Sequence, residues 1–506
     1  MAPAARLTLD PSFRIAPVEP RLFGSFVEHM GRSVYTGIFE PGHPLADAEG
    51  IRTDVLELTR ELGVTLVRYP GGNFVSNYHW EDGVGPVEER PVRLDLAWRS
   101  REDNRFGLNE FMSWAAKAGV EPMMALNLGT RGVTEALQLV EYANYPGGTR
   151  LSELRRAHGV DKPHDIHLWC LGNELDGPWQ MGHKTAGEYG RLAAETARAL
   201  KRFDPGLSLV ACGSSNSGMP TFGAWEAEVL EATYDMVDYI SLHAYYDPSD
   251  GDVDSFLASG ADMEHMIRSI AATADHVGAK LRDRKKIKLS FDEWNVWYQS
   301  RFHGESSLDW AEHPRLIEDA YDVTDAVVVG SLLITLLRNA DRVGVACQAQ
   351  LANVIAPIMT EPGGPAWRQT IFHPFALTAR HARGEVLRVE PECATIDTGR
   401  YGEVPALWST ATHDEATGGL TLFVVNRDRH APCTTEVTLP GGLRAVEHLE
   451  IADADPSARN SAGSPDRVVP RPGTGLHLDG CKATLTLPPA SWTIVRFAPP
   501  ASRSNP

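Results

Sequence analysis

The sequence lacks the cysteine and histidine patterns of a zinc protein or a disulfide scaffold. Its six cysteines lie far apart and include no CxxC pair, which argues against both a zinc site and a framework of disulfides. No two histidines have the HExxH spacing of a metallohydrolase. We therefore interpret His29, His79 and His183 as structural residues and expect no bound metal.

The sequence also lacks a long hydrophobic run. Its longest apolar stretch, residues 326–337, is bounded by Asp325 and Arg338 and falls short of the roughly 20 residues that a membrane span needs. Prolines interrupt the first residues before any apolar stretch, unlike a secretory signal. We expect a cytoplasmic protein without a membrane partner, in which residues 326–337 form a buried helix.

The sequence has fewer positively charged residues than negatively charged ones. Lys and Arg number 48 against 67 Asp and Glu, which gives a formal charge of −19 and disfavours a polyanionic partner such as nucleic acid. No GxGxxG or phosphate-binding loop is present, so we expect no cofactor. Residues 213–218, GSSNSG, do not match the GxSxG motif of a serine hydrolase.

What the sequence does contain is a regular alternation of short apolar runs with amphipathic segments. Helical spacing of apolar residues follows most of the runs, as in TAGEYGRLAAETARALKRF at 185–203. A strand followed by a helix recurs eight times, and this repetition predicts an α/β fold with a (β/α)8 barrel. A doubly wound sheet does not require eight such units. The predicted strands are residues 22–27, 65–69, 121–127, 166–172, 207–213, 239–245, 287–293 and 344–350.

After about residue 380 the sequence pattern changes to predicted strands that alternate with turns, as in PALWSTATH and GLTLFVVNRD. This pattern predicts an antiparallel β-sandwich. We expect a catalytic barrel at 18–380 and a sandwich domain at 381–506, with the opening strand in residues 1–17 joining the sandwich. Residues 452–475 are rich in Pro, Gly and Ser, which predicts a mobile loop.

Barrel enzymes carry their active sites at the C-terminal ends of the strands, so polar residues that end an apolar run are the candidates. They include three glutamates, one aspartate and several amides but no Lys or Ser nucleophile, which suits acid/base chemistry on a polyhydroxylated ligand. Cleavage of a glycoside needs one protonated and one ionised carboxyl group around the bond. Glu174 after the fourth strand and Glu293 at the end of the seventh are predicted to face each other across the barrel mouth. The candidates are Glu28, His29, Arg68, Asn73, Asn127, Asn173, Glu174, His243, Tyr245, Asp292, Glu293 and Gln350.

These motifs resemble those of clan A glycosidases, and in particular the family 51 α-L-arabinofuranosidases. The resemblance runs in order along the whole predicted barrel, so chance does not explain it. The stretches that carry it are FGSFVEHMGRSVYTGIFEP (23–41), VRYPGGNFVSNYHWEDGVGP (67–86), GNELDGPWQMGHKTAGEY (172–189), DYISLHAYY (238–246), FDEWNVWY (291–298) and AQLANVIAPI (349–358).

The resemblance implies a retaining enzyme that removes terminal α-L-arabinofuranosyl groups, with a barrel, a jelly-roll-like sandwich and a hexameric assembly. It makes Glu174 the acid/base and Glu293 the nucleophile. It makes Glu28, Asn73, Asn173 and Gln350 ligands of the furanose hydroxyls and Tyr245 a neighbour of the nucleophile. We interpret Arg68 as a buried electrostatic neighbour of the carboxylates. Trp98, Trp179 and Trp297 are candidate platforms for sugar faces because they follow barrel strands.

Two other functions fit the residues less well. A clan A enzyme acting on β-xylosides or β-glucans would share the carboxylate pair and differ in the shape of the cleft, which residues 299–313 would tune. A noncatalytic sugar-binding barrel is a distant alternative, because both glutamates are present.

Overall fold

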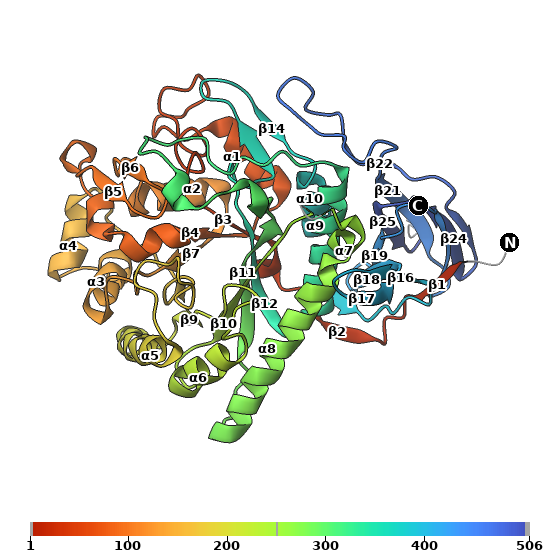
Figure 1. Cartoon of the computed structure of the whole chain (residues 1–506), viewed down its shortest axis with the longest axis horizontal. Helices are drawn as coiled ribbons and strands as arrows, with labels where there is room; N and C mark the ends of the chain where they lie inside the picture. The colour runs from red at the N-terminus through yellow and green to blue at the C-terminus, as the bar shows by residue number, and fades with distance from the viewer. Residues whose placement is uncertain (1–3, 249–250, 501–506) are drawn as a thin grey trace, which may run out of the picture.

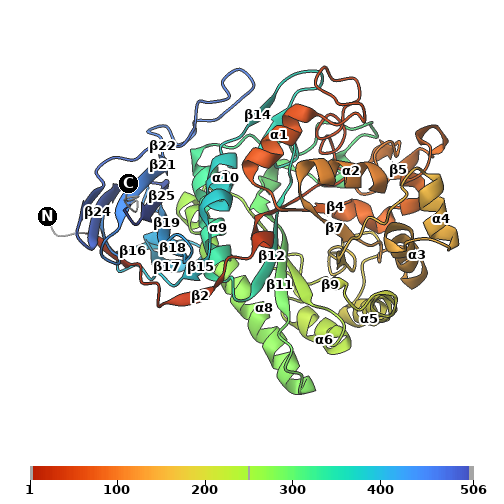
Figure 2. The same cartoon turned by 180° about the vertical axis from the view of Figure 1, so that it is seen from behind.

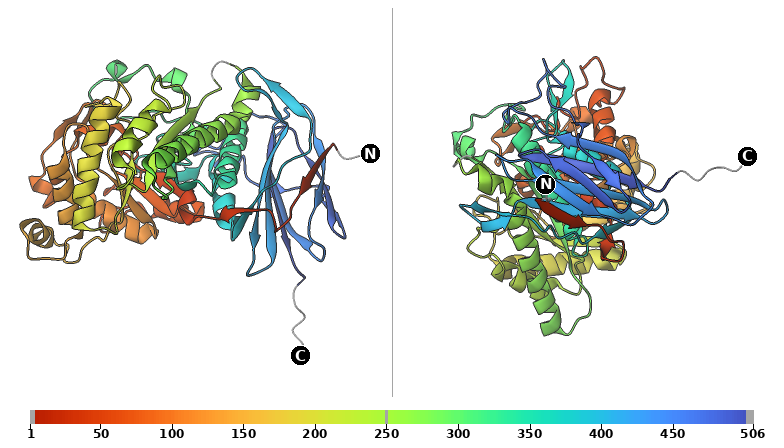
Figure 3. Two further views of the ribbon diagram at one scale, coloured as in Figure 1. Left: turned by 90° about the horizontal axis from the view of Figure 1, so that it is seen from below. Right: turned by 90° about the vertical axis from the view of Figure 1, so that its right-hand side faces the viewer.

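The computed structural model describes residues 4–248 and 251–500, which form a barrel with a β-sandwich packed against one side. Figure 1 shows the barrel in red to green and the sandwich in blue, and Figure 3 shows the two bodies side by side from below. No helix in the described ranges combines the length and the apolar character needed to cross a membrane.

All eight predicted barrel strands are confirmed. They pair in parallel and close in the order β10-β11-β12-β3-β4-β7-β8-β9, as in a TIM barrel. Each is buried almost throughout, as expected for strands covered by helices on one side and a packed interior on the other. Their bounds are β3 Gly24–Phe26, β4 Leu66–Tyr69, β7 Glu121–Ala125, β8 Leu168–Cys170, β9 Ser208–Ala211, β10 Tyr239–Tyr246, β11 Lys288–Val296 and β12 Val343–Ala349.

The helices around the barrel form where the apolar spacing predicted them. In α5, Thr185 caps the first turn and Glu188 completes a capping box, while the apolar residues recur every three or four positions on the buried face. The helices are α1 Thr53–Leu62, α2 Leu108–Ala118, α3 Val133–Asn144, α4 Arg150–Ala157, α5 Ala186–Phe203, α6 Ala224–Thr233, α7 Val253–Leu257, α8 Ser259–Leu281, α9 Val323–Arg338 and α10 Phe372–His381.

The C-terminal part contains two sheets that face each other across a second core. One sheet has the order β2-β15-β18-β19-β25-β21-β22 and the other β1-β20-β24-β23, and Leu422, Leu485 and Phe497 lie between them. Strand bounds are β15 Glu385–Leu387, β18 Leu407–Asp414, β19 Gly419–Asn426, β20 Cys433–Thr438, β21 Arg444–Ile451, β22 Arg471–Pro472, β23 His477–Asp479, β24 Lys482–Leu487 and β25 Ser491–Ala498.

The opening segment joins the sandwich. Strand β1, Ala5–Thr8, pairs in parallel with β20, and β2, Arg14–Pro17, pairs antiparallel with β15, as Figure 2 shows for the red strand β2. Short hairpins lie outside the main sheets. They are β5 Arg93–Asp95 with β6 Ser100–Glu102, β13 Ile358–Thr360 with β14 Ala366–Arg368, and β16 Thr395–Thr398 with β17 Gly402–Pro405.

The apolar run at 326–337 lies in α9, which is buried on all sides between the barrel and the sandwich. Trp408 on β18 donates a hydrogen bond to Thr335 at 3.0 Å, and Trp492 on β25 lies against Gly330. A helix that is apolar all round needs neighbours on every side, and the sandwich supplies the outer one.

The expectation of a mobile loop at 452–475 needs correction. Its backbone is irregular, but Ala458 and Val468 are buried in the core cluster shared with the barrel, and Asn460 exchanges two hydrogen bonds with Val468 at 2.7 and 3.0 Å. Composition predicted the irregular backbone. It could not predict docking, because the partner surface is built from residues distant in sequence.

Candidate active site

The C-terminal ends of the barrel strands surround a cavity of about 600 Å³. Of the sequence candidates, Glu28, Asn73, Trp98, Glu174, Trp179, Tyr245, Glu293, Trp297 and Gln350 line it. The structure therefore brings together residues from six parts of the chain, as expected for the catalytic face of a barrel.

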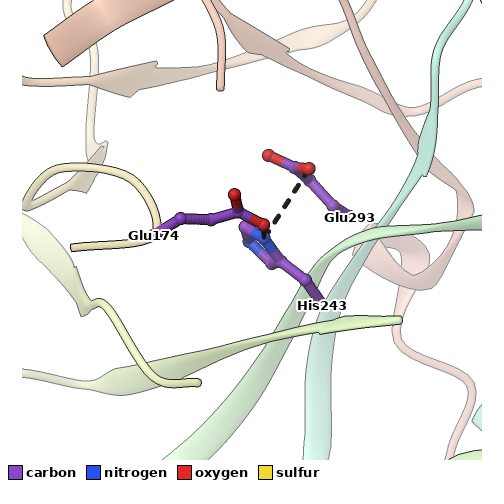
Figure 4. A group of neighbouring side chains, drawn as sticks. All are labelled: Glu174, His243 and Glu293. Atoms are coloured by element: carbon purple, nitrogen blue, oxygen red, sulfur yellow. Dashed lines mark hydrogen bonds and ion pairs between the residues drawn. The ribbon is translucent and has the colours of Figure 1, made fainter. Parts of the chain in front are cut away.

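Glu174 and Glu293 point toward each other across this cavity, with the ring of His243 beside both (Figure 4). One carboxylate oxygen of each glutamate and one ring nitrogen of His243 all lie within 4.8 Å of one another. The two carboxyl groups are thus close enough to act on the same bond of a ligand, as the sequence predicted for a catalytic pair.

Glu293 lies within β11 in a setting that supports a carboxylate. Arg68 on β4 donates to its Oε1 at 2.7 Å, and the hydroxyl of Tyr245 on β10 donates to its Oε2 at 2.7 Å. Two donors on different oxygens hold the carboxylate in one orientation and stabilise its charge. Arg68 is fully buried and also donates to Asn173 at 2.6 Å, which agrees with its interpretation as an electrostatic neighbour.

Glu174 follows β8 in a different setting. Its backbone has a φ of +45°, a left-handed conformation that is uncommon outside glycine and recurs at functional sites. Trp179 donates to its Oε2 at 2.7 Å and His243 bonds its Oε1 at 2.8 Å. Burial raises the pKa of Glu174; the hydrogen bond from His243 opposes this, and the charge of Glu293 adds to the rise.

Strand β11 carries one extra residue beside this pair. Ser241 and His243 on β10 face Ser290 and Glu293 on β11, so three steps on β11 match two on its neighbour. The same mismatch recurs toward β12, between Phe291 and Trp294. Such a bulge lets consecutive side chains depart from the strict alternation of a strand, and both Asp292 and Glu293 approach Arg68.

A third carboxyl group, Glu28, closes one side of the cavity. Its Oε1 accepts hydrogen bonds from the backbone of Phe74 at 2.9 Å and from the indole of Trp98 at 2.8 Å. Gln350 accepts from the backbone of Glu28 at 3.1 Å. Burial raises the pKa of Glu28 to about 8, against the bond from Phe74, and the charge of Glu293 adds to the rise.

Glycines allow the chain to pass between these carboxyl groups. Gly71 has a φ of +147°, and a Cβ there would lie 2.5 Å from Cγ of Glu28. A Cβ on Gly72 would lie 3.1 Å from Oε2 of Glu28 and 3.2 Å from Oε1 of Glu293. Only glycine suits the first position, so the loop that ends in Asn73 can approach both acids.

Asn173, Asn127 and His29 are sequence candidates that do not line the cavity. Asn173 is buried and bonds Arg68 and, at 3.4 Å, Gln180, and it is not among the residues that line the cavity. Its predicted contact with a sugar hydroxyl stays a prediction. Asn127 bonds the backbone of Tyr78 and the hydroxyl of Thr130 instead of facing the cavity. His29 bonds Glu102 and Tyr69, in keeping with a structural role.

Aromatic rings form one wall of the cavity. The rings of Trp297 and Tyr245 meet edge to face with centroids 5.2 Å apart, and Phe302 lies 6.1 Å from both Trp297 and Trp98. Trp179 is 43% exposed and beside Glu174. The sequence analysis did not identify Phe302 as a lining residue, because it lies in the loop after β11 and carries no polar signal.

Other lining residues were also missed or set aside. Ser215, Asn216 and Ser217 belong to the GSSNSG segment and line the cavity near Glu174, where Asp176 accepts a hydrogen bond from the backbone of Ser215 at 3.0 Å. The position of this segment directly after β9 was the available signal. The remaining lining residues are Met30, Gly72, Gln299, Gly304, Glu305, Ile317 and Ile355.

Two family models match the chain. The α-L-arabinofuranosidase 1 domain matches residues 58–262, and the α-L-arabinofuranosidase C-terminal domain matches residues 292–491. The two matches cover most of the barrel and most of the sandwich.

Characterised relatives are similar over nearly the whole chain. An intracellular exo-α-(1→5)-L-arabinofuranosidase from Streptomyces lividans is 63% identical over 99% of this chain and 76% of the relative. An exo-α-(1→6)-L-arabinofuranosidase from Bifidobacterium longum is 54% identical over 97% of each chain.

Solved structures of α-L-arabinofuranosidases are also similar to this chain over nearly its whole length. A family 51 α-L-arabinofuranosidase from Bifidobacterium longum has a TM-score of 0.95 at 48% identity, covering 98% of this chain and 100% of the other. An α-L-arabinofuranosidase from Thermotoga maritima in complex with arabinose has a TM-score of 0.87 at 32% identity, covering 97% of this chain and 99% of the other. With its barrel, its sandwich and its facing glutamates, the chain belongs to the family 51 α-L-arabinofuranosidases.

Proposed function

We propose that the protein is a retaining, exo-acting α-L-arabinofuranosidase. It removes terminal non-reducing α-L-arabinofuranosyl residues from arabino-oligosaccharides or from fragments of arabinan and arabinoxylan. The observation that carries the proposal is the pair Glu174 and Glu293, whose nearest oxygens lie within 4.8 Å. Retaining enzymes space their carboxyl groups about 5 to 5.5 Å apart, whereas inverting enzymes leave about 6.5 to 9.5 Å for a water molecule.

In the first half of the reaction, Glu293 attacks the anomeric carbon while Glu174 protonates the departing oxygen. Arg68 and Tyr245 orient the attacking carboxylate through their hydrogen bonds. Burial raises the pKa of Glu174 and so favours its protonated form, which a general acid needs. In the second half, Glu174 accepts a proton from water as the water displaces Glu293 from the sugar.

The charges around the site support this assignment. Arg68 and a protonated His243 supply two positive charges, and the carboxylates of Asp292 and Glu293 supply two negative ones. A protonated Glu174 leaves the buried cluster balanced, while its ionisation adds a negative charge to a region of low dielectric.

The polar residues around the cavity support recognition of a terminal furanose ring. Glu28 accepts hydrogen bonds from the indole of Trp98 and the amide of Gln350, and these polar atoms suit recognition of vicinal hydroxyls together with those of Asn73 and Asn173. Trp179 donates a hydrogen bond to Glu174 and lines the same cavity as Asn216, and we expect the leaving group beside them. Neither a β-xyloside or β-glucan specificity nor a noncatalytic sugar-binding role is favoured by any observation.

The test is turnover of 4-nitrophenyl α-L-arabinofuranoside beside the β-D-xyloside and β-D-glucoside, with NMR detection of the anomer formed first. We expect the arabinofuranoside to be cleaved fastest with retention, and Glu293→Gln to lose at least about 1,000-fold in kcat. Glu264→Gln, a change in a glutamate of α8 that pairs with Arg338, serves as the matched control. Inversion, or full activity of Glu293→Gln, would contradict the mechanism.

The assembly and the location rest on likeness to relatives. We expect a homo-hexamer in the cytoplasm, because the sequence resembles family 51 and several relatives are named intracellular enzymes. Light scattering that gave a monomer at micromolar concentration would contradict the proposed hexamer. Activity found mainly in the culture medium of intact cells would contradict the proposed location.

Dialysis against a chelator should leave kcat unchanged, since we expect no metal.

A further inference from the structure

Asp292 is a buried acid that the mechanism above does not use. It precedes the nucleophile Glu293 on β11, and in a regular strand its side chain would point to the opposite face of the barrel wall. The bulge on β11 changes this, because the register slips by one residue at this point against both β10 and β12. Asp292 and Glu293 therefore both face charged groups of the interior.

The contacts of Asp292 link it to the acid/base through one residue. Its Oδ1 lies 2.8 Å from Nε2 of His243, and Nδ1 of the same ring lies 2.8 Å from Oε1 of Glu174. The Asp292 side chain is 1% exposed and the His243 side chain 2% exposed. The imidazole is therefore held between two carboxyl groups by both of its nitrogens.

Charged and titratable groups from several strands face Asp292 and His243. Asp292 is faced by His243 on β10, Arg68 on β4 at 3.9 Å and the Cys170 thiol on β8 at 3.9 Å. His243 is faced by Asp292, by Glu174 and, at 3.6 Å, by Glu293. The cysteine thiols of the barrel are neutral, because burial raises the pKa values of Cys170 and Cys347 and raises that of Cys212 to about 12.

These surroundings favour a charged imidazolium. Burial by itself lowers the pKa of His243, but the charge of Glu293 and the bonds to Asp292 and Glu174 outweigh it and hold that pKa well above its ordinary value. A ring that donates through both nitrogens must carry both protons.

We propose that Asp292 is a positioning residue that keeps His243 protonated and fixed against Glu174, so that the imidazolium supports Glu174 as an ionised base in the second half of the reaction. The inference rests on the retaining mechanism proposed above. Asp292 is not among the residues that line the cavity, and its link to Glu174 runs through His243.

The second half is the step that needs this support. Once Glu293 is bonded to the sugar, its negative charge is gone and Glu174 must become a carboxylate in a buried site. Water then attacks the anomeric carbon, its proton passes to Glu174, and the bond from the carbon to the Glu293 oxygen breaks with its electron pair returning to Glu293. A cation 2.8 Å from Glu174 stabilises the carboxylate before the proton arrives. It is less important in the first half, which begins with Glu174 protonated.

The experiment compares wild type, Asp292→Asn and Asp325→Asn on 4-nitrophenyl α-L-arabinofuranoside. Asparagine keeps the size of Asp292 and an acceptor for His243 but removes the charge. We expect kcat of Asp292→Asn to fall about tenfold or more with KM falling in parallel, so that kcat/KM changes little, because hydrolysis of the glycosyl-enzyme becomes limiting. A burst of nitrophenolate should appear, and azide, which needs no base, should restore turnover.

Asp325, a fully buried acid at the start of α9 that accepts from Tyr298 at 2.9 Å, is the matched control, and Asp325→Asn should keep both kinetic constants. His243→Gln should reproduce the split of Asp292→Asn and keeps the test valid if that variant does not fold. The double variant should be no slower than the slower single one.

Equal losses in kcat and kcat/KM for Asp292→Asn, without a burst, would reduce Asp292 to a structural residue and overturn the inference. Failure of the proposed function is seen separately, as inversion of the anomer by the wild-type enzyme.

Discussion

At the scale of single residues, two glutamates at the same barrel mouth differ because different strands supply their partners. Glu293 receives hydrogen bonds from Arg68 and Tyr245, which favour its carboxylate. Among the described residues, no arginine forms an ion pair with Glu174, which is bonded by Trp179 and His243, so burial dominates and its pKa rises. Environments that separate two acids in this way assign one as the proton donor and the other as the nucleophile.

Replacement of the acid/base gives the first prediction. Glu174→Ala should slow hydrolysis of an arabinan disaccharide by about 1,000-fold or more, because its leaving group needs protonation, and slow formation of nitrophenolate from an activated aryl arabinofuranoside less. Azide should accelerate turnover of the aryl substrate and give an arabinosyl azide detectable by mass spectrometry. Equal losses on both substrates without rescue would remove Glu174 as the acid.

Glu28 gives a prediction on stability. Its pKa is raised in the folded protein to about 8 from an ordinary 4.5, so the folded state binds this proton more tightly than the unfolded state. The contribution to stability is therefore present below about pH 4.5 and is lost as pH rises toward 8. We expect Glu28→Gln, which keeps an acceptor for Trp98, to melt higher than wild type by a few degrees at pH 8 and by much less at pH 5. A difference in Tm that does not change with pH would contradict this.

The Glu28→Gln variant should also lose activity, since stabilising changes in active sites often cost function.

At the scale of elements, α9 explains how an apolar helix avoids exposure. Its inner face packs on the barrel, and its outer face meets β18, β19 and β25 of the sandwich. Arg338 and Arg427 lie over Trp408, with guanidinium carbons 4.3 and 4.5 Å from the ring centroid. The helix is therefore shared by both bodies, which is why its sequence lacks a polar face.

The close contact at Gly330 in α9 can be tested directly. Alanine is the better helix former by about 1 kcal/mol, but a Cβ here would lie 2.1 Å from Cδ1 of Trp492. Overpacking costs about 1 to 3 kcal/mol, so Gly330→Ala should lower the Tm. Gly190→Ala in α5, where the nearest atom would be at an ordinary 3.4 Å, should keep or raise it. Thermal unfolding followed by circular dichroism compares the two, and a stabilised Gly330→Ala would show that the packing is loose.

At the scale of the whole molecule, the barrel and the sandwich share one core. The main cluster of buried residues includes barrel residues such as Trp294 and sandwich residues such as Phe423, Ile451 and Ile494. The segment at 452–470 adds a second contact, since Arg459 lies 3.9 Å from Asp322 at the start of α9. The barrel core therefore extends into the sandwich, which also has the second core between its two sheets. The boundaries at 18–380 and 381–506 stay a prediction.

A truncated barrel tests this. Residues 18–380 expressed alone expose the outer face of α9, and we expect the product to aggregate, because an exposed apolar patch of this kind drives association. The soluble fraction after centrifugation and the size by light scattering are the measurements. A soluble, folded and active fragment would show that the sandwich is dispensable for the barrel.

Local patterns made most of the fold predictable. Each barrel strand was visible as a short apolar run, and the polar residue that ended it identified the catalytic face, so Glu174, Glu293, Glu28 and Gln350 could be found without coordinates. Prediction from the sequence failed where a contact depended on residues that are distant along the chain. Phe302 in the aromatic wall is one such case, and docking of residues 452–475 is another.

The sequence by itself determined the barrel, the sandwich and the identity of the two facing glutamates, because apolar periodicity and the position of a residue at a strand end are local properties. Only the tertiary structure decided how those glutamates are charged. His243 reaches Asp292 and Glu174 across separations of 49 and 69 residues, and the bulge that turns Asp292 inward appears only when β11 pairs with its neighbours. The protonation of a buried acid depends on every charge within a few ångströms, and barrel closure brings those charges together.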